Sequence, residues 1–478
     1  MFRLSHLINK EDKQGFFRNF SVLVVCNLLV NVINLFTNMY LARQLGPELY
    51  GQYGVLITWS TLIQTVASLG VQQVAIRAIA RDQSNSKYYF KLSMIARSIG
   101  FISIVPWFVL YFFFHEHYDA FFIVAIVLNA LMLFLWYSFQ NVAFGMQRME
   151  YTGYINVVGA AVLLLTYLVL PSKVVSVSVV ILLLIIIELL KDVIYYCACS
   201  KEGLFTSSGI RLVSKGEVLN MIRESFPFFI LILFGLSTNN LPVLFLDYHT
   251  NTTEVAYFNT ANKLMVPLTM ALNTMMSALF PSLTKHAKNA PDKFFSQSQK
   301  ALWMIVLIGG YICFCISLFS DYIVLLIYGK DYAETGIVML TQCWYAVIFA
   351  ILSLFGTIYA AVGKDKLLAT LSISNALIWG PIIWWCSKDG ATSMSYGFLI
   401  GGGINLIYNY FFYLKCLPKK VSASSSIQIF VIMLIGICLS LYLPPILPMI
   451  GKVIAFLAIS VVMGWGVNKS IVPVISKK

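Results

Sequence analysis

The stretch that decides the fold class lies between residues 20 and 42, and it reads FSVLVVCNLLVNVINLFTNMYLA. It contains no charged residue, and it is long enough for an α-helix to cross ~30 Å of lipid hydrocarbon. Backbone polar groups inside lipid must find their partners within the chain, and a helix satisfies them all. The stretch therefore predicts a membrane-spanning helix.

The rest of the chain repeats this pattern. It has 478 residues, of which 59% are hydrophobic and 11% charged, and its mean hydropathy is +0.81. Soluble domains carry roughly 25% charged residues, so a soluble enzyme is excluded. We expect an all-α, polytopic integral membrane protein with about 14 spans (12–14). The predicted spans are 20–42, 54–76, 90–114, 120–143, 154–170, 174–196, 226–246, 255–281, 301–319, 337–360, 367–386, 393–414, 427–446 and 450–468.

The basic residues are distributed unevenly between the predicted loops. If the N-terminus is cytoplasmic, most of the 33 Lys and Arg residues lie in or beside the inner loops. The exceptions are Arg43, Lys173, Lys263, Lys330, Lys388 and Lys452. Such a bias is the positive-inside rule, so we expect both termini in the cytoplasm. The net charge of +13 is thus a topology signal, and no nucleic-acid partner is predicted.

The predicted outer loops, such as Gly46–Tyr53 and Ser320–Thr335, are short. A membrane glycosyltransferase or polymerase usually needs a sizeable external loop that carries acid, base or metal ligands. His115 and His117 resemble a metal-binding fragment, but two histidines at an aromatic membrane edge are more typical of an interface. We expect no catalytic residue, no metal site and no prosthetic cofactor.

Four predicted spans carry polar residues along one face, whereas the span 174–196 is dominated by Val, Ile and Leu. Polar faces avoid lipid, so these spans are expected to surround a solvated cavity. The alternative is hydrogen bonding between helices, worth about 0.6 kcal/mol per contact. The polar candidates for the cavity lining are Asn31, Asn34 and Asn38 in the first span, Thr61 and Thr65 in the second, and Asn259 and Asn262 in the eighth. The seventh span adds the polar run 237–240.

Lys263 is the most informative candidate for a binding residue, because it lies well inside the eighth span. A lysine at the centre of a span costs ~2.5–3.5 kcal/mol, so it should face water, a ligand or a counter-charge such as Asp247 or Glu254. Arg77 and Arg97 lie near the inner ends of their spans, where snorkelling to the surface is the alternative to a role in binding.

Glu188, Lys191 and Asp192 follow one another at helical spacing near the predicted inner end of the sixth span. Residues three and four apart on a helix are neighbours. We interpret these three residues as a local charge cluster.

The four polar spans form two pairs, the first with the second and the seventh with the eighth. The second pair follows the first at an offset of six spans, which suggests an internal repeat. An even number of helices gives both halves the same orientation, and two such bundles facing across a cavity would suit alternating access. We expect an N-terminal lobe with six helices at 1–200, a cytoplasmic connecting loop at 201–225, and a C-terminal lobe with six helices at 226–416. Two additional C-terminal helices are expected at 427–470.

Four segments resemble a known family: NMYLARQLGPELYGQY at 38–53, SLGVQQVAIR at 68–77, EVAYFNTANK at 254–263 and LLIYGKDY at 325–332. They are similar to the polysaccharide-transporter family, whose members include the O-antigen flippases of the multidrug/oligosaccharidyl-lipid/polysaccharide superfamily. Their order and spacing extend the resemblance over nearly the whole chain.

The resemblance implies two six-helix lobes around a cationic lumen in the bacterial cytoplasmic (inner) membrane. The implied cargo is an oligosaccharide on undecaprenyl diphosphate, a repeat unit of O-antigen or a similar surface polysaccharide, flipped to the periplasmic leaflet. Arg77, Arg97 and Lys263 are then the candidate partners of the diphosphate. A coupling ion (H⁺ or Na⁺), membrane lipids and the polysaccharide polymerase machinery are further expected partners of a monomeric transport unit.

Two other functions stay open from the residues alone. A multidrug antiporter of the same fold would favour a buried acidic cation site, yet no Asp or Glu lies deep in the first four predicted spans or in the seventh to twelfth. A membrane glycosyltransferase or polymerase is disfavoured by the short outer loops.

Overall fold

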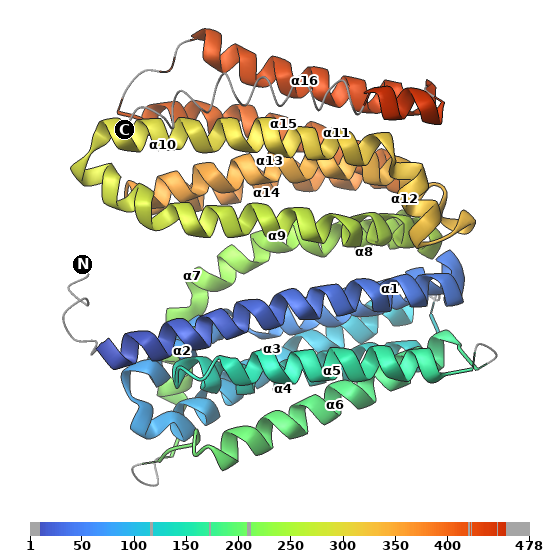
Figure 1. Cartoon of the computed structure of the whole chain (residues 1–478). Helices are drawn as coiled ribbons and strands as arrows, with labels where there is room; N and C mark the ends of the chain where they lie inside the picture. The colour runs from blue at the N-terminus through green and yellow to red at the C-terminus, as the bar shows by residue number, and fades with distance from the viewer. Residues whose placement is uncertain are drawn as a thin grey trace. The chain divides into compact units, whose positions relative to one another are not determined.

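The structure is a computed structural model that describes residues 10–114, 118–171, 174–207, 212–418, 421, 423–446 and 448–455. Every regular element in these ranges is helical (Figure 1). Nine helical segments among the described residues are long and apolar enough to cross a membrane. The chain is therefore an all-α, multi-pass membrane protein, as the sequence predicts.

The nine segments and the fourteen predicted spans differ partly in how helices are divided, and the helices at 177–201 and 423–446 are not among the nine. The segment Ser21–Ala67 joins nearly all of the first predicted span to the first part of the second, and Lys366–Cys416 contains the eleventh and twelfth. Most of the fourteenth predicted span and the His115–His117 fragment lie outside the described residues. The count of fourteen therefore stays a prediction.

The chain divides into two compact units, Met1–Leu244 and Phe245–Lys478. The helices of the first unit are α1 (Lys10–Ala67), α2 (Val71–Arg81), α3 (Ser86–Phe114), α4 (Ala120–Gly145), α5 (Glu150–Val169), α6 (Val177–Lys201) and α7 (Lys215–Asn239). The helix α8 (Leu241–His249) crosses the boundary. The helices of the second unit are α9 (Thr252–Asn289), α10 (Pro291–Met304), α11 (Gly310–Leu318), α12 (Ser320–Ile327), α13 (Thr335–Ala361), α14 (Asp365–Cys386), α15 (Gly390–Cys416) and α16 (Ala423–Ile446).

The predicted outer loop Gly46–Tyr53 is wrong, because the chain there is helical apart from one break. Gly46 adopts φ 72°, a conformation that glycine reaches without steric cost. Pro47 then restarts the helix, since its fixed φ suits a first helical position and its missing N–H is not needed there. Hydropathy marks this stretch as polar, but it cannot show that the turn is one residue long.

The predicted connecting loop 201–225 is also shorter than expected, because α7 begins at Lys215. The Ser214 hydroxyl accepts a hydrogen bond from the Glu217 N–H, and the Glu217 carboxylate accepts one from the Ser214 N–H. This capping box starts a polar first turn that hydropathy does not recognise as part of a span. The sequence places the span 226–246 in the second lobe, but α7 packs against α1, α2 and α3 of the first unit.

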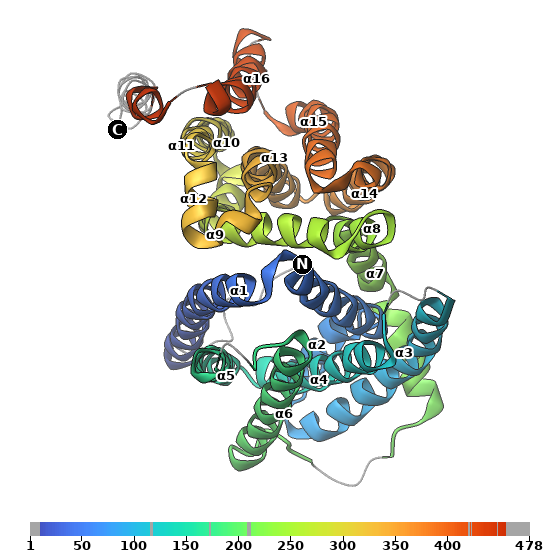
Figure 2. The same cartoon turned by 90° about the vertical axis from the view of Figure 1, so that its right-hand side faces the viewer.

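The first unit is a bundle in which α1 packs against α3, α4 and α5, and α4 packs against α6 (Figure 2). One of its apolar clusters joins Trp136 and Phe139 of α4 to Tyr195 and Cys199 of α6. The outward side of α6 is apolar, with exposed residues that include Leu182, Ile186, Leu189, Leu190, Val193 and Ile194. That side has the composition of a lipid-facing surface.

The second unit is built around α13, which packs against both α9 and α15. Most residues of α13 are buried, from Thr335 to Ala361. Because α13 covers one side of α9, the two sides of α9 have different surroundings. The candidate site lies on the side of α9 that α13 does not cover.

Glu254 at the start of α9 also holds the start of α15. Its Oε2 atom accepts a 2.6 Å hydrogen bond from the backbone N–H of Ala391, next to Gly390 at φ 91°. A carboxylate at a helix N-terminus pairs with free N–H groups and with the helix dipole.

We expect Glu254→Ala to destabilise the protein by about 1–2 kcal/mol, the usual cost of losing a helix cap. The measurement is thermal unfolding of the purified protein in detergent. Glu334→Ala is the matched control, since Glu334 precedes α13 without a capping hydrogen bond from its side chain. Equal melting temperatures of the two variants would contradict the capping role.

Candidate functional site

The helix α9 has a packed side and a polar side. On the packed side Val255, Ala256 and Ala261 are fully buried, and the hydroxyl oxygens of Thr260 and Thr335 lie 3.1 Å apart. On the other side Asn259 and Asn262 are half-buried and Lys263 is exposed. We call Asn259, Asn262 and Lys263 the α9 polar face.

The α9 polar face has no partners among the described residues. None of its three side chains forms a hydrogen bond or an ion pair with another described part of the chain. Glu254, a possible counter-charge of Lys263, instead binds the N–H of Ala391. Among the described residues, the structure therefore shows no counter-charge paired with Lys263.

This face would be costly against lipid. A lysine at the centre of a span costs ~2.5–3.5 kcal/mol, and unpaired amides add to that cost. The exposed apolar residues of α6 show what a lipid-facing side of this protein looks like. By composition, the α9 polar face is suited to border water or a polar ligand.

The asparagines of α1 bond mainly within their own helix. The Nδ2 atoms of Asn31 and Asn38 donate to the carbonyl oxygens of Asn27 and Asn34, at 2.9 and 2.6 Å. The hydroxyl of Tyr50, beyond the Gly46 break, donates to Asn38 Oδ1 at 2.8 Å. The side chains of Asn31, Asn34 and Asn38 are half-buried, so their role in binding a ligand stays a prediction.

The threonines in the second half of α1 are satisfied in the same way. The Thr61 hydroxyl donates to the carbonyl oxygens of Ile57 and Thr58, and the Thr65 hydroxyl lies 3.5 Å from Gln64 Oε1. The bonds of Thr61 to the preceding turn satisfy its hydroxyl proton within the helix, and the role of Thr61 and Thr65 in binding a ligand stays a prediction. Asn240 Nδ2 donates to the Thr58 carbonyl at 3.3 Å, whereas the side chains of 237–239 lie outside the described residues.

The two predicted arginines have different surroundings. Arg77 is exposed on α2, and its guanidinium carbon lies 4.9 Å from the ring centroid of Phe228 on α7. Arg97 is fully buried, lies 4.5 Å from the Phe134 ring centroid, and donates from Nη1 to the Ser138 hydroxyl. Its Nε and Nη2 atoms have no hydrogen-bond partner. Arg97 therefore does not snorkel to the surface.

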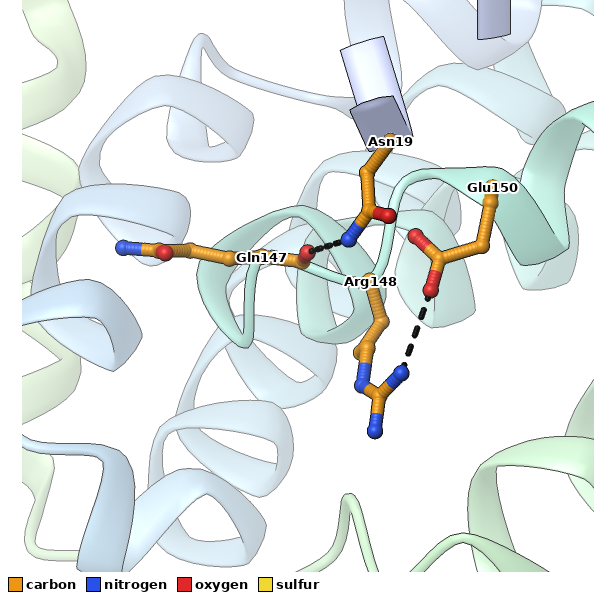
Figure 3. Close-up of polar contacts among 4 residues, drawn as sticks. All are labelled: Asn19, Gln147, Arg148 and Glu150. Carbon is orange, nitrogen blue, oxygen red and sulfur yellow. Dashed lines mark hydrogen bonds and ion pairs between the residues drawn. The ribbon is translucent and has the colours of Figure 1, made fainter. Parts of the chain in front are cut away.

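Polar contacts lie around the α4–α5 turn of the first unit (Figure 3). Asn19 Nδ2 near the start of α1 donates to the Gln147 carbonyl at 3.1 Å. The Arg148 guanidinium pairs with Glu150 Oε1 at 3.3 Å within the same turn. The Asn19 contact joins the first part of α1 to the α4–α5 turn, and neither contact involves a predicted site residue.

The second unit contains a polar network that hydropathy did not indicate. Asn409 Nδ2 on α15 donates to Asn375 Oδ1 on α14 at 2.8 Å, and Asn405 Nδ2 donates to the Asn375 carbonyl at 3.3 Å. Asn405 Oδ1 is buried without a partner. The spacing of Asn405 and Asn409, one helical turn apart, was the available signal.

The sequence was also compared with known protein families and curated proteins. The sequence profile of a family described as "Polysaccharide biosynthesis protein" matches residues 16–287. No curated protein matches the chain in sequence.

Several solved structures share the fold. A structure of the lipid II flippase MurJ in an inward closed conformation has a TM-score of 0.73 at 13% identity, covering 94% of this chain and 99% of that one. An inward-facing multidrug resistance MATE transporter of the MOP superfamily has a TM-score of 0.66 at 13% identity, covering 84% and 95%. A MOP superfamily transporter from Pyrococcus furiosus has a TM-score of 0.56 at 13% identity, covering 88% and 96%. These likenesses show that the chain shares the fold of these three proteins.

Proposed function

This chain belongs to the polysaccharide biosynthesis protein family, since the matched residues make up more than half of it, and from that premise we propose that it is a flippase. The proposed cargo is an oligosaccharide linked to undecaprenyl diphosphate, a repeat unit of O-antigen or a similar surface polysaccharide. It would move from the cytoplasmic to the periplasmic leaflet of a bacterial inner membrane by alternating access.

The α9 polar face is the observation that carries this proposal. A diphosphate in a low-dielectric surrounding needs a basic partner, because an isolated buried anion costs tens of kcal/mol. The Lys263 ammonium is exposed and unpaired among the described residues, so it is free to meet such an anion. The neighbouring amides of Asn259 and Asn262 supply donors and acceptors that suit sugar hydroxyls.

The half-buried stripe of α1 supports the same function. We propose that Asn31, Asn34, Asn38, Thr61 and Thr65 contact the sugars during transport, and that the exposed Arg77 binds the diphosphate. The lipid tail would stay in the bilayer. Both termini would lie in the cytoplasm, in keeping with the positive-inside distribution of charge.

A cell that lacks this protein is expected to accumulate lipid-linked oligosaccharide on the cytoplasmic side and to lose surface polysaccharide. The measurement is surface glycan together with the accessibility of lipid-linked sugars to a membrane-impermeant oxidant in inside-out and right-side-out vesicles. Restoring the wild-type protein should reverse both changes. Normal surface glycan in cells without the protein, combined with new sensitivity to drugs, would favour a multidrug antiporter instead.

A further inference from the structure

The charge cluster of α6 is more buried than its sequence suggests. Lys191 Nζ lies 2.9 Å and 2.8 Å from the two carboxylate oxygens of Glu188. The exposed fractions of the two side chains are only 13% and 16%. This pair is therefore mostly shielded from water.

The pair occupies a slot formed by neighbouring helices. The Lys191 ammonium lies 4.6 Å from the ring centroid of Trp136 on α4. A Cβ atom at Gly159 on α5 would lie 2.4 Å from the Lys191 Cδ atom, so only glycine leaves room for this side chain. The position of Lys191, and with it the pairing of Glu188, is thus set by three helices.

Asp192 stands next to this pair and has no partner. It is 3% exposed, and neither carboxylate oxygen forms a hydrogen bond. An ionised carboxylate in such surroundings is far costlier than the neutral acid, because nothing replaces the lost water. The packed structure therefore favours Asp192 with a proton bound.

The surrounding charges leave Asp192 without a neutralising partner. The charged groups that act on it are Glu188 and Lys191, and Lys191 is already bound to Glu188. The other titratable groups that face the cluster are influenced by the charge of Glu188: Tyr53 from α1, Tyr137 from α4 and Tyr167 from α5. Glu150 on α5 pairs with Arg148, and its charge influences Tyr195 on α6.

We propose that Asp192 takes up and releases the proton that couples transport to an ion gradient, an inference that rests on the proposed flippase function. When the helices around α6 part and water reaches Asp192, the O–H bond breaks and the proton passes to water. The new carboxylate then competes with Glu188 for the Lys191 ammonium. Repacking requires the proton to return.

The buried, unpartnered carboxyl group of Asp192 is suited to hold a proton. A metal cation bound by oxygen needs several ligands around it. Among the described residues no three or more His, Cys, Asp or Glu side chains are close enough to hold one. A proton needs only one carboxylate oxygen.

The first test uses dicyclohexylcarbodiimide, an apolar reagent that modifies protonated carboxyl groups, on the purified full-length protein in detergent. Mass spectrometry should find the adduct on Asp192, with a yield that falls as the pH rises, and none in Asp192→Asn. Glu188, whose carboxylate oxygens are bound to the Lys191 ammonium, should be modified much less. An Asp192 that stays unmodified at every pH where the protein is folded would overturn the proposal.

The second test follows oligosaccharide flipping in proteoliposomes under an imposed pH gradient. The wild type should respond to the gradient, Asp192→Asn should lose the response, and Asp192→Glu should regain it. Glu202→Gln, at the exposed end of α6, is the matched control and should respond like the wild type. Flipping by the wild type that ignores the gradient would overturn the proton site and leave the flippase function intact. If the wild type does not flip the substrate at all, the flippase function fails, and the labelling result alone decides the proton site.

Discussion

Lys263→Ala is expected to reduce surface-polysaccharide export by about tenfold to hundredfold, the effect of losing one charge-assisted contact to an anion. The protein level should remain near that of the wild type. Lys263 is exposed and forms no hydrogen bond or ion pair with other described residues, so its removal breaks no such interaction. A purely structural lysine would show the opposite pattern, with protein and export lost together.

The measurement is surface glycan per molecule of membrane-inserted protein, in cells that depend on the variant. Lys263→Arg keeps the charge and should retain most of the export. Lys330→Ala, an exposed lysine in the turn before α13, serves as the control and should export normally. If Lys263→Ala exports as well as this control, Lys263 does not belong to the transport path.

Gly70→Ala is expected to destabilise the protein by about 2–5 kcal/mol and to lower its amount in the membrane. Gly70 has φ 71°, where a side chain is strained. A Cβ atom there would lie 2.6 Å from the Phe229 nitrogen and 2.7 Å from the Ser225 oxygen, both backbone atoms of α7. Neither atom can give way unless α7 shifts as a whole.

Thermal unfolding in detergent, together with the yield of the membrane-inserted protein, measures this effect. Gly235→Ala is the matched control on α7, because a Cβ atom at Gly235 would meet nothing within 4 Å. It should melt near the wild-type temperature or slightly above, since alanine favours the helix. Equal melting temperatures for both variants would show that the close approach of α7 to Gly70 contributes little to stability.

Much of the fold could be predicted from hydropathy, because a run such as 20–42 has only one stable form in lipid. The helix boundaries could not. The turn at Gly46 depends on the φ of a single residue, and the start of α7 at Lys215 depends on a capping box in a polar stretch. Neither feature changes the average hydropathy of a window.

The candidate site was predictable in part. The position of Lys263 inside a span indicated an unusual environment, and the structure shows it exposed and unpaired among the described residues. The pairing of Glu188 with Lys191 followed from their spacing and is confirmed. The burial of Asp192 and Arg97 could not be predicted, because it depends on which helices pack against α6 and α3 rather than on the helices themselves.

The most direct test of the account is the flipping of a fluorescent oligosaccharide on undecaprenyl diphosphate in liposomes that contain the purified protein. A membrane-impermeant reagent that destroys the label on the outer leaflet reports the exposed fraction over time. We predict that this fraction approaches completion in liposomes with the wild type, whereas about half of the label stays protected without it, as expected for a symmetric bilayer, and that Lys263→Ala slows the process at least tenfold. A wild-type trace that coincides with the trace from empty liposomes would contradict the proposal that this chain is a flippase.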